Sequence, residues 1–219
     1  MRLYRIYAVT RQCRFLLGAS ELAKNTKKEA KELSLQQNIV LYFHDLTYLL
    51  AIIMVVFVLI FRIVIVDGTS MNLTLLHGDY ILLLNNLFYG EPETGDIIVL
   101  SKNSYDDGAP LVKRVIATEG QIVDIDFESG IVYVDGVQLV EPYVNTPTNT
   151  TGGMKFPLIV DDGCVFVMGD NRNKSKDSRY PEIGMIDERE VLGKAIFLVL
   201  PGTNRGEYEA DYSRIGALS

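Results

Sequence analysis

The sequence predicts a mainly β domain behind a single N-terminal transmembrane helix. Two observations support this fold class: one long apolar segment at residues 46–66, and a series of short β-branched or aromatic runs after it. The apolar segment predicts a membrane anchor. The runs predict a strand-rich domain over residues 67–219, which is long enough to bury a core of its own. A tail of residues 1–45 precedes the anchor.

The anchor segment, Leu46–Val66, carries one charge, Arg62. At about 1.5 Å per residue a helix over this segment would span ~31 Å, close to the ~30 Å hydrocarbon core of a bilayer. A helix that stopped at Phe61 would span only about 24 Å. We therefore expect it to continue past Arg62, whose side chain can reach the headgroups, or to begin earlier, within Ile39–Phe43. A cleaved signal peptide would have a shorter apolar core nearer the N-terminus and an A-x-A-like site behind it, so the sequence favours an uncleaved anchor.

Charge is distributed unevenly on the two sides of the anchor. Residues 1–45 carry eight Lys and Arg against four acids, whereas residues 67–219 carry twelve against 24. The positive-inside rule then predicts a single-pass protein of the plasma membrane, with a cytoplasmic tail and an extracytoplasmic domain. The acidic outer domain argues against nucleic acid as a partner, and the lipid bilayer is the expected partner of the anchor.

The two cysteines, Cys13 and Cys164, fall on opposite sides of the predicted membrane and so cannot pair with each other. The sequence has no metal-ligand spacing, and Cys164 is interpreted as a small buried hydrophobe. We expect a fold held together by packing, without a metal or a cofactor.

Strands are predicted almost throughout the outer domain. The runs that indicate them are Tyr80–Leu84, Ile97–Leu100, Leu111–Ala117, Gln121–Asp126, Ile131–Val134, Val165–Met168 and Ala195–Leu200. Alternation around Ser129-Gly130 indicates a hairpin, part of a small excursion over about residues 121–160 that includes a polar loop at 145–153. Only residues 20–37 and 46–62 look helical.

A serine and a lysine stand out against this background. Ser70 follows the end of the apolar segment, and Lys113 comes 43 residues later, opening the apolar run Val115-Ile116-Ala117. A serine at a membrane boundary, together with a lysine inside hydrophobic sequence, favours a Ser-Lys nucleophile pair over a Ser-His-Asp triad. The apolar neighbours of Lys113 would lower its pKa by desolvation, as a lysine base requires.

Other serine-hydrolase arrangements are absent or disfavoured. His44 abuts the cytoplasmic end of the anchor, and His77 lies in a turn, where an ordinary exposed histidine is the simpler interpretation. The G-x-S-x-G elbow is missing, because Asn72 stands where its second glycine would be, and no serine has a lysine three residues later.

Four blocks of the outer domain, in this order, resemble those of bacterial type I signal peptidases, Gram-positive-like branch. They are Gly68–Leu75, Gly95–Val99, Lys113–Ile116 and Gly169–Arg179. The resemblance runs from the anchor to about Ala195 and does not cover the tail. Two departures are Leu73, where the family usually has proline, and Gln121, where it usually has aspartate.

The resemblance implies a coiled β-sheet or barrel that carries a Ser-Lys dyad. Ser70 would be the nucleophile and Lys113 the general base, with Ser175 hydrogen-bonding Lys113 and the Ser70 N–H holding the oxyanion. Gly68 stands where some members have a hydroxyl residue. Met71 would pack near the substrate, and ion pairs and turns would support the site. The residues implied in that support are Arg114, Asp170, Asn171, Asp177 and Arg179.

The resemblance also implies a function: removal of signal peptides from secreted preproteins after an A-x-A pattern, near the secretion translocon. The substrate would bind extended between Ile63–Val66 and Leu111–Ala117, by strand addition. Another Ser-Lys protease with a dedicated substrate and an anchored, non-catalytic binding module with the same fold are alternatives. A self-cleaving repressor would carry a DNA-binding helix-turn-helix in place of the anchor.

Overall fold

The computed structural model describes residues 35–207 and 209–218. Most of the predicted tail and most of the predicted helix at 20–37 lie outside these residues, as does Cys13. The chain folds as two compact units, one ending at Met54 and the other beginning at Val55.

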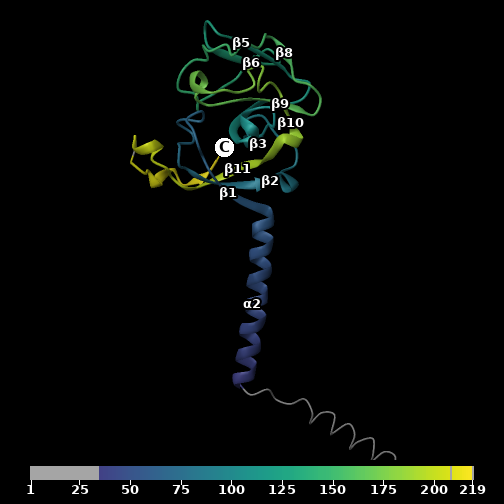
Figure 1. Ribbon diagram of the computed structural model, residues 1–219, viewed down its shortest axis with the longest axis vertical. Coiled ribbons are helices and arrows are strands. Elements are labelled where there is room, and N and C mark those ends of the chain that lie inside the picture. The colour runs from purple at the N-terminus through teal and green to yellow at the C-terminus, as the bar shows by residue number, and fades with distance from the viewer. Residues whose placement is uncertain (1–34, 208, 219) are drawn as a thin grey trace, which may run out of the picture. The chain divides into compact units, whose positions relative to one another are not determined.

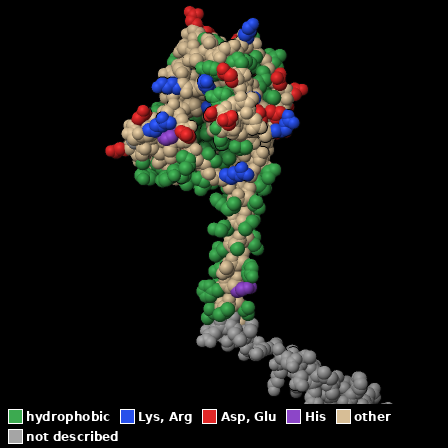
Figure 2. Space-filling model, viewed as in Figure 1, with side chains coloured by type: hydrophobic (Ala, Val, Ile, Leu, Met, Phe, Trp, Pro, Cys, Tyr) green, Lys and Arg blue, Asp and Glu red, His purple; other side chains and the backbone are tan. Residues whose placement is uncertain are grey.

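The helix before the outer domain, α2, runs from Leu35 to Ile60. Its part Asn38–Ile60 has a mean hydropathy of 2.3 and is long and apolar enough to cross a bilayer. Hydrophobic side chains cover it along its length (Figure 2). Of the two alternatives drawn from the sequence, an earlier start is the one observed, although the helix begins at Leu35 rather than within Ile39–Phe43, and the continuation past Arg62 is wrong. Residues Phe61–Ile65 form strand β1 instead, because their backbone pairs with the strand that follows and the β-branched Ile63, Val64 and Ile65 favour a strand.

The outer domain is mainly β, and every strand pairing is antiparallel. The larger sheet contains β1 (Phe61–Ile65), β2 (Tyr80–Asn85), β3 (Ile97–Ser101), β4 (Pro110–Ala117), β9 (Cys164–Met168), β10 (Ile186–Asp187), β11 (Val191–Leu200) and β12 (Gly216–Ala217). Its order is β1-β2-β11-β3-β4-β9-β10, with β12 pairing to β11. A short helix, α3 (Asn86–Tyr89), follows β2 (Figure 1).

A second, four-stranded sheet lies at the end of the domain remote from β1 (Figure 1). Its order is β7-β6-β5-β8, built from β5 (Ile122–Asp126), β6 (Ile131–Val134), β7 (Val137–Gln138) and β8 (Leu158–Ile159). The β5–β6 hairpin is the one that the alternation around Ser129-Gly130 predicted. This sheet has its own core with Ile116, Phe166 and Met168 of the larger sheet.

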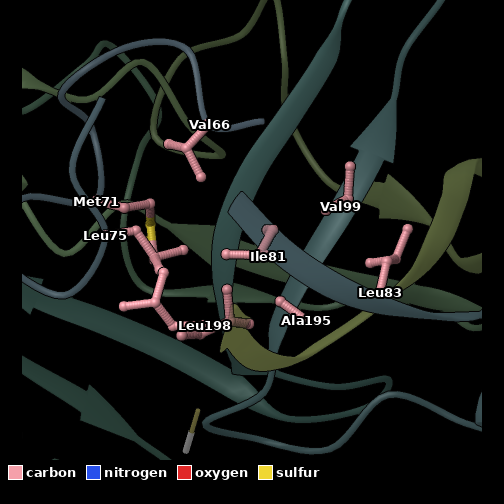
Figure 3. Packing of buried hydrophobic residues seen from close by; sticks show 9 residues of the cluster. Val66, Met71, Leu75, Ile81, Leu83, Val99, Ala195 and Leu198 are labelled. Carbon is pink, nitrogen blue, oxygen red and sulfur yellow. The ribbon is translucent and has the colours of Figure 1, made fainter. Parts of the chain in front are cut away.

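The larger sheet is coiled, and its hydrogen-bonded path is open from β1 to β10, so it is not a closed barrel. Strands β1 and β4 are separated by three strands in this path, yet Val64 of β1 and Val112 of β4 pack on one core cluster. We call it the Met71 cluster. Its buried members are Val66, Met71, Leu75, Ile81, Leu83, Ile97, Val99, Ala195 and Leu198 (Figure 3). Register shifts in β11 at Ala195/Phe197 and Leu198/Leu200 help to bend the sheet around this cluster.

All seven predicted strands are present, with ends that differ by a few residues, and β11 begins earlier than predicted, at Val191. Short strands with too few residues for a periodic pattern were missed, namely β7, β8, β10 and β12. Cys164, expected to be buried, is half-buried at the start of β9 and has no disulfide partner among the described residues.

Candidate active site

Ser70 lies in the loop that connects β1 to β2, residues 66–79, which we call the Ser70 loop. The ends of the loop are joined by hydrogen bonds from Val66 N to Asp79 O (2.9 Å) and from Gly78 N to Val66 O (2.8 Å). Gly68 has a φ of +115°, a conformation that side-chain-bearing residues rarely adopt, and so glycine is required there. The loop thus leaves β1, turns sharply at Gly68 and brings Ser70 back over the sheet.

Lys113 comes to Ser70 from the middle of the sheet. It lies on β4, opposite Ile98 of β3, and only 3% of its surface is exposed. Its Nζ lies 2.8 Å from Ser70 Oγ, at hydrogen-bonding distance. The structure therefore brings together the two residues that the sequence singled out, although they are 43 positions apart.

Burial lowers the pKa of Lys113 from 10.5 to about 8, because the sheet removes water from the ammonium form. The carboxylates of Asp177 and Asp170 oppose this shift, and the guanidinium of Arg179 adds to it. At pH 8 about half of the molecules would have a neutral amine, compared with well under one in a hundred for an unperturbed lysine. A neutral amine can accept the proton of the Ser70 hydroxyl.

A second loop, residues 169–179, encloses Ser70, and we call it the signature loop. Asn171 donates from its backbone N to Ser70 O (2.9 Å) and from its side-chain Nδ2 to Thr69 O (2.9 Å). The two loops approach closely at Gly169, where an added β-carbon would lie 2.5 Å from Ser70 O. A larger residue at this position would push the serine away from its place, so Gly169 and Asn171 fix the backbone of Ser70.

Two buried ion pairs hold the signature loop. Arg114, next to Lys113, binds Asp170 through Nε and Nη2 at 2.9 Å each and donates through Nη1 to Gly95 O at 2.7 Å. Arg179 binds Asp177 through Nε (2.8 Å) and Nη2 (2.9 Å). All four charged side chains are 0–2% exposed. Bidentate pairs of this kind fix orientation as well as distance, which fits the supporting role expected for these four residues.

Ser175 lies beside the site, but the hydrogen bond to Lys113 that the resemblance implied is absent among the described residues. Its hydroxyl instead lies 3.5 Å from the carbonyl oxygen of Lys176. A β-carbon added to Gly169 would lie 2.3 Å from Ser175 Oγ, so the hydroxyl packs against the glycine backbone. Glycine at position 169 leaves the space that the Ser175 side chain occupies.

The Met71 side chain is buried in the core, whereas the Ser70 N–H has no hydrogen-bond acceptor in the described part of the chain. The Met71 side chain is 1% exposed and packs beside Leu75 in the Met71 cluster (Figure 3). Val112 of β4 is partly buried against the same cluster. By contrast, the Ser70 N–H donates to no acceptor in the described part of the chain. The Gly68 N–H donates to His77 Nδ1 (3.2 Å), so His77, expected to be exposed, is half-buried and holds the turn.

Several polar contacts around the site were not predicted. Arg172, 0% exposed, donates to Gly169 O at 3.1 Å and forms a bidentate ion pair with Glu141. Asn173 Oδ1 accepts from the backbone N–H groups of Asn149 (3.1 Å) and Thr150 (3.2 Å). The predicted polar loop at 145–153 is therefore bound to the signature loop. In the sequence, only the charge of Arg172 within the signature could have indicated that the signature loop binds a neighbouring loop.

Within the described residues, no group of three or more His, Cys, Asp or Glu side chains could hold a metal ion.

A serine hydroxyl at hydrogen-bonding distance from a buried amine, on a mainly β domain, has the arrangement of a serine peptidase whose base is a lysine. The comparisons with known proteins agree with this class. A model described as "Signal peptidase, peptidase S26" matches residues 39–200, and the chain belongs to this family.

Two relatives and one solved structure illustrate the similarity. The probable signal peptidase I-1 of Synechocystis sp. is 37% identical over 150 residues, covering 65% of this chain and 72% of its own. Signal peptidase I of Bacillus licheniformis is 33% identical over 150 residues, covering 65% and 78%. The crystal structure of a signal peptidase I from Enterococcus faecalis is 31% identical, with a TM-score of 0.40, and covers 48% of this chain and 97% of its own. The resemblance recognised in the sequence is confirmed.

The buried amine gives a prediction about stability. At pH 7 the folded protein holds Lys113 mostly protonated, at a cost of about 3 kcal/mol relative to the unfolded chain, given its lowered pKa. Lys113→Met removes this cost, so we expect the variant to unfold several degrees above the wild type at pH 7. Because the unfolded wild type keeps its proton between pH 8 and 10.5 while the folded one loses it, the difference should shrink over that range.

Thermal unfolding of the full chain in detergent, at intervals from pH 7 to 10.5, measures this effect. The exposed Lys155→Met is the matched control and should show no such trend. A difference between Lys113→Met and wild type that stayed constant with pH would mean that the lysine is not desolvated.

Proposed function

We propose that this protein is a membrane-anchored serine endopeptidase that removes N-terminal signal peptides from exported proteins, with Ser70 as nucleophile and Lys113 as general base. The observation that carries the proposal is the 2.8 Å contact between Ser70 Oγ and a lysine amine whose pKa is lowered by burial. The relatives, which are named signal peptidases, support the substrate class.

The proposed reaction has two steps. The neutral amine of Lys113 takes the proton of Ser70 as its Oγ attacks the scissile carbonyl, and the ammonium then protonates the leaving amine. Water hydrolyses the acyl-enzyme in the second step, with Lys113 again the base. The Ser70 N–H, which has no acceptor in the described part of the chain, is available to hold the oxyanion in both steps.

The free strand edges near the site support an extended substrate. Pairing of β4 with β9 begins at Arg114, so no strand covers that edge of β4 at Leu111–Lys113 in the described chain. Strand β1 ends the hydrogen-bonded path of the sheet, and its outer edge is free as well. A peptide could add to either edge by backbone hydrogen bonds. The partly buried side chains of Val64 on β1 and Val112 on β4 pack against the apolar Met71 cluster, and this surface would receive side chains that point the same way.

Charge and hydropathy support the proposed location. Helix α2 would cross the plasma membrane, with the basic tail in the cytoplasm and the acidic domain outside. An enzyme in this orientation would meet precursors as they leave the secretion translocon. The partners would thus be the bilayer, the translocon at close range and the signal peptides themselves.

The decisive experiment is incubation of the full chain in detergent with a precursor, followed by N-terminal sequencing of the product. We expect Ser70→Ala and Lys113→Ala each to reduce the cleavage rate ~10⁴-fold or more, and the double variant to be little worse, because the two residues act as one unit. Ser104→Ala and Lys155→Ala, both exposed, are matched controls. Losses that added in the double variant would show that the two residues do not cooperate.

A binding module with the same fold, or a protease with a dedicated substrate, would give a different result. The module would not cleave at all, and the dedicated protease would ignore a general precursor. Labelling of Ser70 by a serine-directed acylating inhibitor separates these two alternatives, because only a protease would react.

The pH dependence of kcat/KM follows from the pKa of Lys113. Activity requires the neutral amine, so kcat/KM should rise with pH along a limb with an apparent pKa near 8. Initial rates of precursor cleavage from pH 6 to 10 measure it. A limb near 6.5 would instead indicate a histidine base and contradict the assignment of Lys113.

Extended binding predicts which substrate positions are read. Side chains at −1 and −3 before the cut would face the Met71 cluster together, and the −2 side chain would point away. A leucine at −1 cannot bring its carbonyl to Ser70 Oγ, and ~1 Å of misplacement can cost ~10²-fold in rate. We expect −1 Ala→Leu in a model precursor to lower kcat/KM at least that much, and the same change at −2 to have little effect. Equal tolerance at the two positions would contradict the extended mode.

A further inference from the structure

The last part of the chain, residues 201–218, follows the region matched by the signal peptidase family model, which ends at residue 200. We call it the C-terminal segment. It contains a short 3₁₀ helix, Tyr212–Arg214, whose first turn is capped by Asp211. It then returns to the larger sheet, where β12 pairs with β11 and Leu218 N donates to Ile196 O (3.0 Å). The end of the segment is thus attached to the larger sheet at β11.

Arg214 of this segment reaches the Ser70 loop. Its guanidinium donates to both carboxylate oxygens of Asp79, from Nη1 to Oδ1 (3.1 Å) and from Nη2 to Oδ2 (2.6 Å). Nη2 also lies 3.2 Å from the carbonyl oxygen of Thr74. The Asp79 side chain is 0% exposed and that of Arg214 is 19% exposed, so water screens the pair little.

Asp79 organises the end of the Ser70 loop. Besides Arg214, its carboxylate accepts hydrogen bonds from Leu76 N (2.8 Å) and from Gly202 N (2.6 Å). A buried carboxylate of this kind is stable only while its charge is compensated, and Arg214 is the cation that compensates it. The shape of the loop at Leu76–Asp79 therefore depends on a residue 135 positions later.

Thr74 shows how this constraint reaches the site. Its hydroxyl donates to Asp170 Oδ2 (2.5 Å), the carboxylate that Arg114 binds, and its carbonyl accepts from Arg214. The residue four positions after Ser70 is consequently held from two sides, by the signature loop and by the C-terminal segment. Removal of one side would leave the loop free to shift against Lys113.

A backbone contact reinforces the same junction. An added β-carbon on Gly202 would lie 2.5 Å from His77 O and 2.6 Å from Asp79 N, so the segment and the loop touch without intervening side chains. Asn204 N also donates to His77 O at 3.0 Å. The C-terminal segment is therefore packed against the loop over several residues.

We propose that Arg214 is a positioning residue for Ser70: through Asp79 and Thr74 it holds the Ser70 loop at the distance that lets Lys113 activate the hydroxyl. The inference rests on the proposed function, because Ser70 must be the nucleophile. Loss of the contact should reduce kcat more than it raises KM, since the strand edges expected to bind the substrate belong to β1 and β4. A displaced Ser70 loop would also let water reach Lys113, so the pH limb should move upward from about 8.

The test compares Arg214→Gln, Arg214→Lys and the wild type, as full chains in detergent, below the unfolding temperature of each. We expect Arg214→Gln to lower kcat at least ~10-fold with KM within about twofold, and to raise the apparent pKa of the limb. Arg214→Lys keeps the positive charge but not the planar guanidinium that makes two hydrogen bonds to Asp79, and it should recover part of the rate. Arg205→Gln is the matched control, because Arg205 lies in the same segment and pairs with Asp67 of the Ser70 loop, but at 3.7 Å and with both side chains exposed.

The rate of Ser70 labelling by an acylating inhibitor distinguishes the failure of this inference from failure of the proposed function. If the wild type reacts but cleaves no precursor, the substrate assignment fails, and slower labelling of Arg214→Gln still supports the positioning role. If Arg214→Gln does not fold, Arg214→Lys carries the comparison. A wild-type kcat, limb and labelling rate in the Arg214 variant that folds would overturn the inference.

Discussion

The desolvation of one amine is the constraint on which the site depends. In the proposed reaction, Lys113 can act on Ser70 near neutral pH only because the sheet excludes water from it, and that exclusion requires neighbours around the amine. Strand β3 pairs with β4, which carries Lys113, and the signature loop binds the backbone of Ser70. The ion pairs and the close approach at Gly169 serve the same end, because each one keeps the loops from opening and rehydrating the amine.

This requirement explains why so much charge is buried around Ser70 Oγ and Lys113 Nζ. A loop fixed only by apolar contacts can slide, whereas a bidentate guanidinium–carboxylate pair fixes both angle and distance. The cost of burying those charges is offset only if nearly every donor and acceptor is satisfied. The contacts of Arg172 and Arg179 with backbone carbonyls meet that condition, and they connect the signature loop to the polar loop beyond it.

The sequence was sufficient for the seven longer strands of the outer domain after β1 and for the pairing of Ser70 with Lys113. A lysine that opens an apolar run is unusual, and alternation identified the β5–β6 hairpin. The end of the helix was misjudged because Ile63–Val66 is both apolar enough for a membrane and β-branched enough for a strand, and only pairing with β2 decides. Asp79 was not singled out in the sequence. Nothing in a local pattern indicates that a carboxylate will be buried against an arginine at the other end of the chain.

Three arginines of the described chain, Arg114, Arg172 and Arg179, are fully buried, and this burial determines how the site responds to salt. Each of these guanidinium groups forms an ion pair with a carboxylate, through a planar group that fixes the orientation of the pair. Counterions also reach buried pairs poorly, so the strength of these ion pairs changes little with ionic strength. The buried arginine–carboxylate pairs thus keep a nearly constant electrostatic environment around the Lys113 amine when the salt concentration of the medium changes.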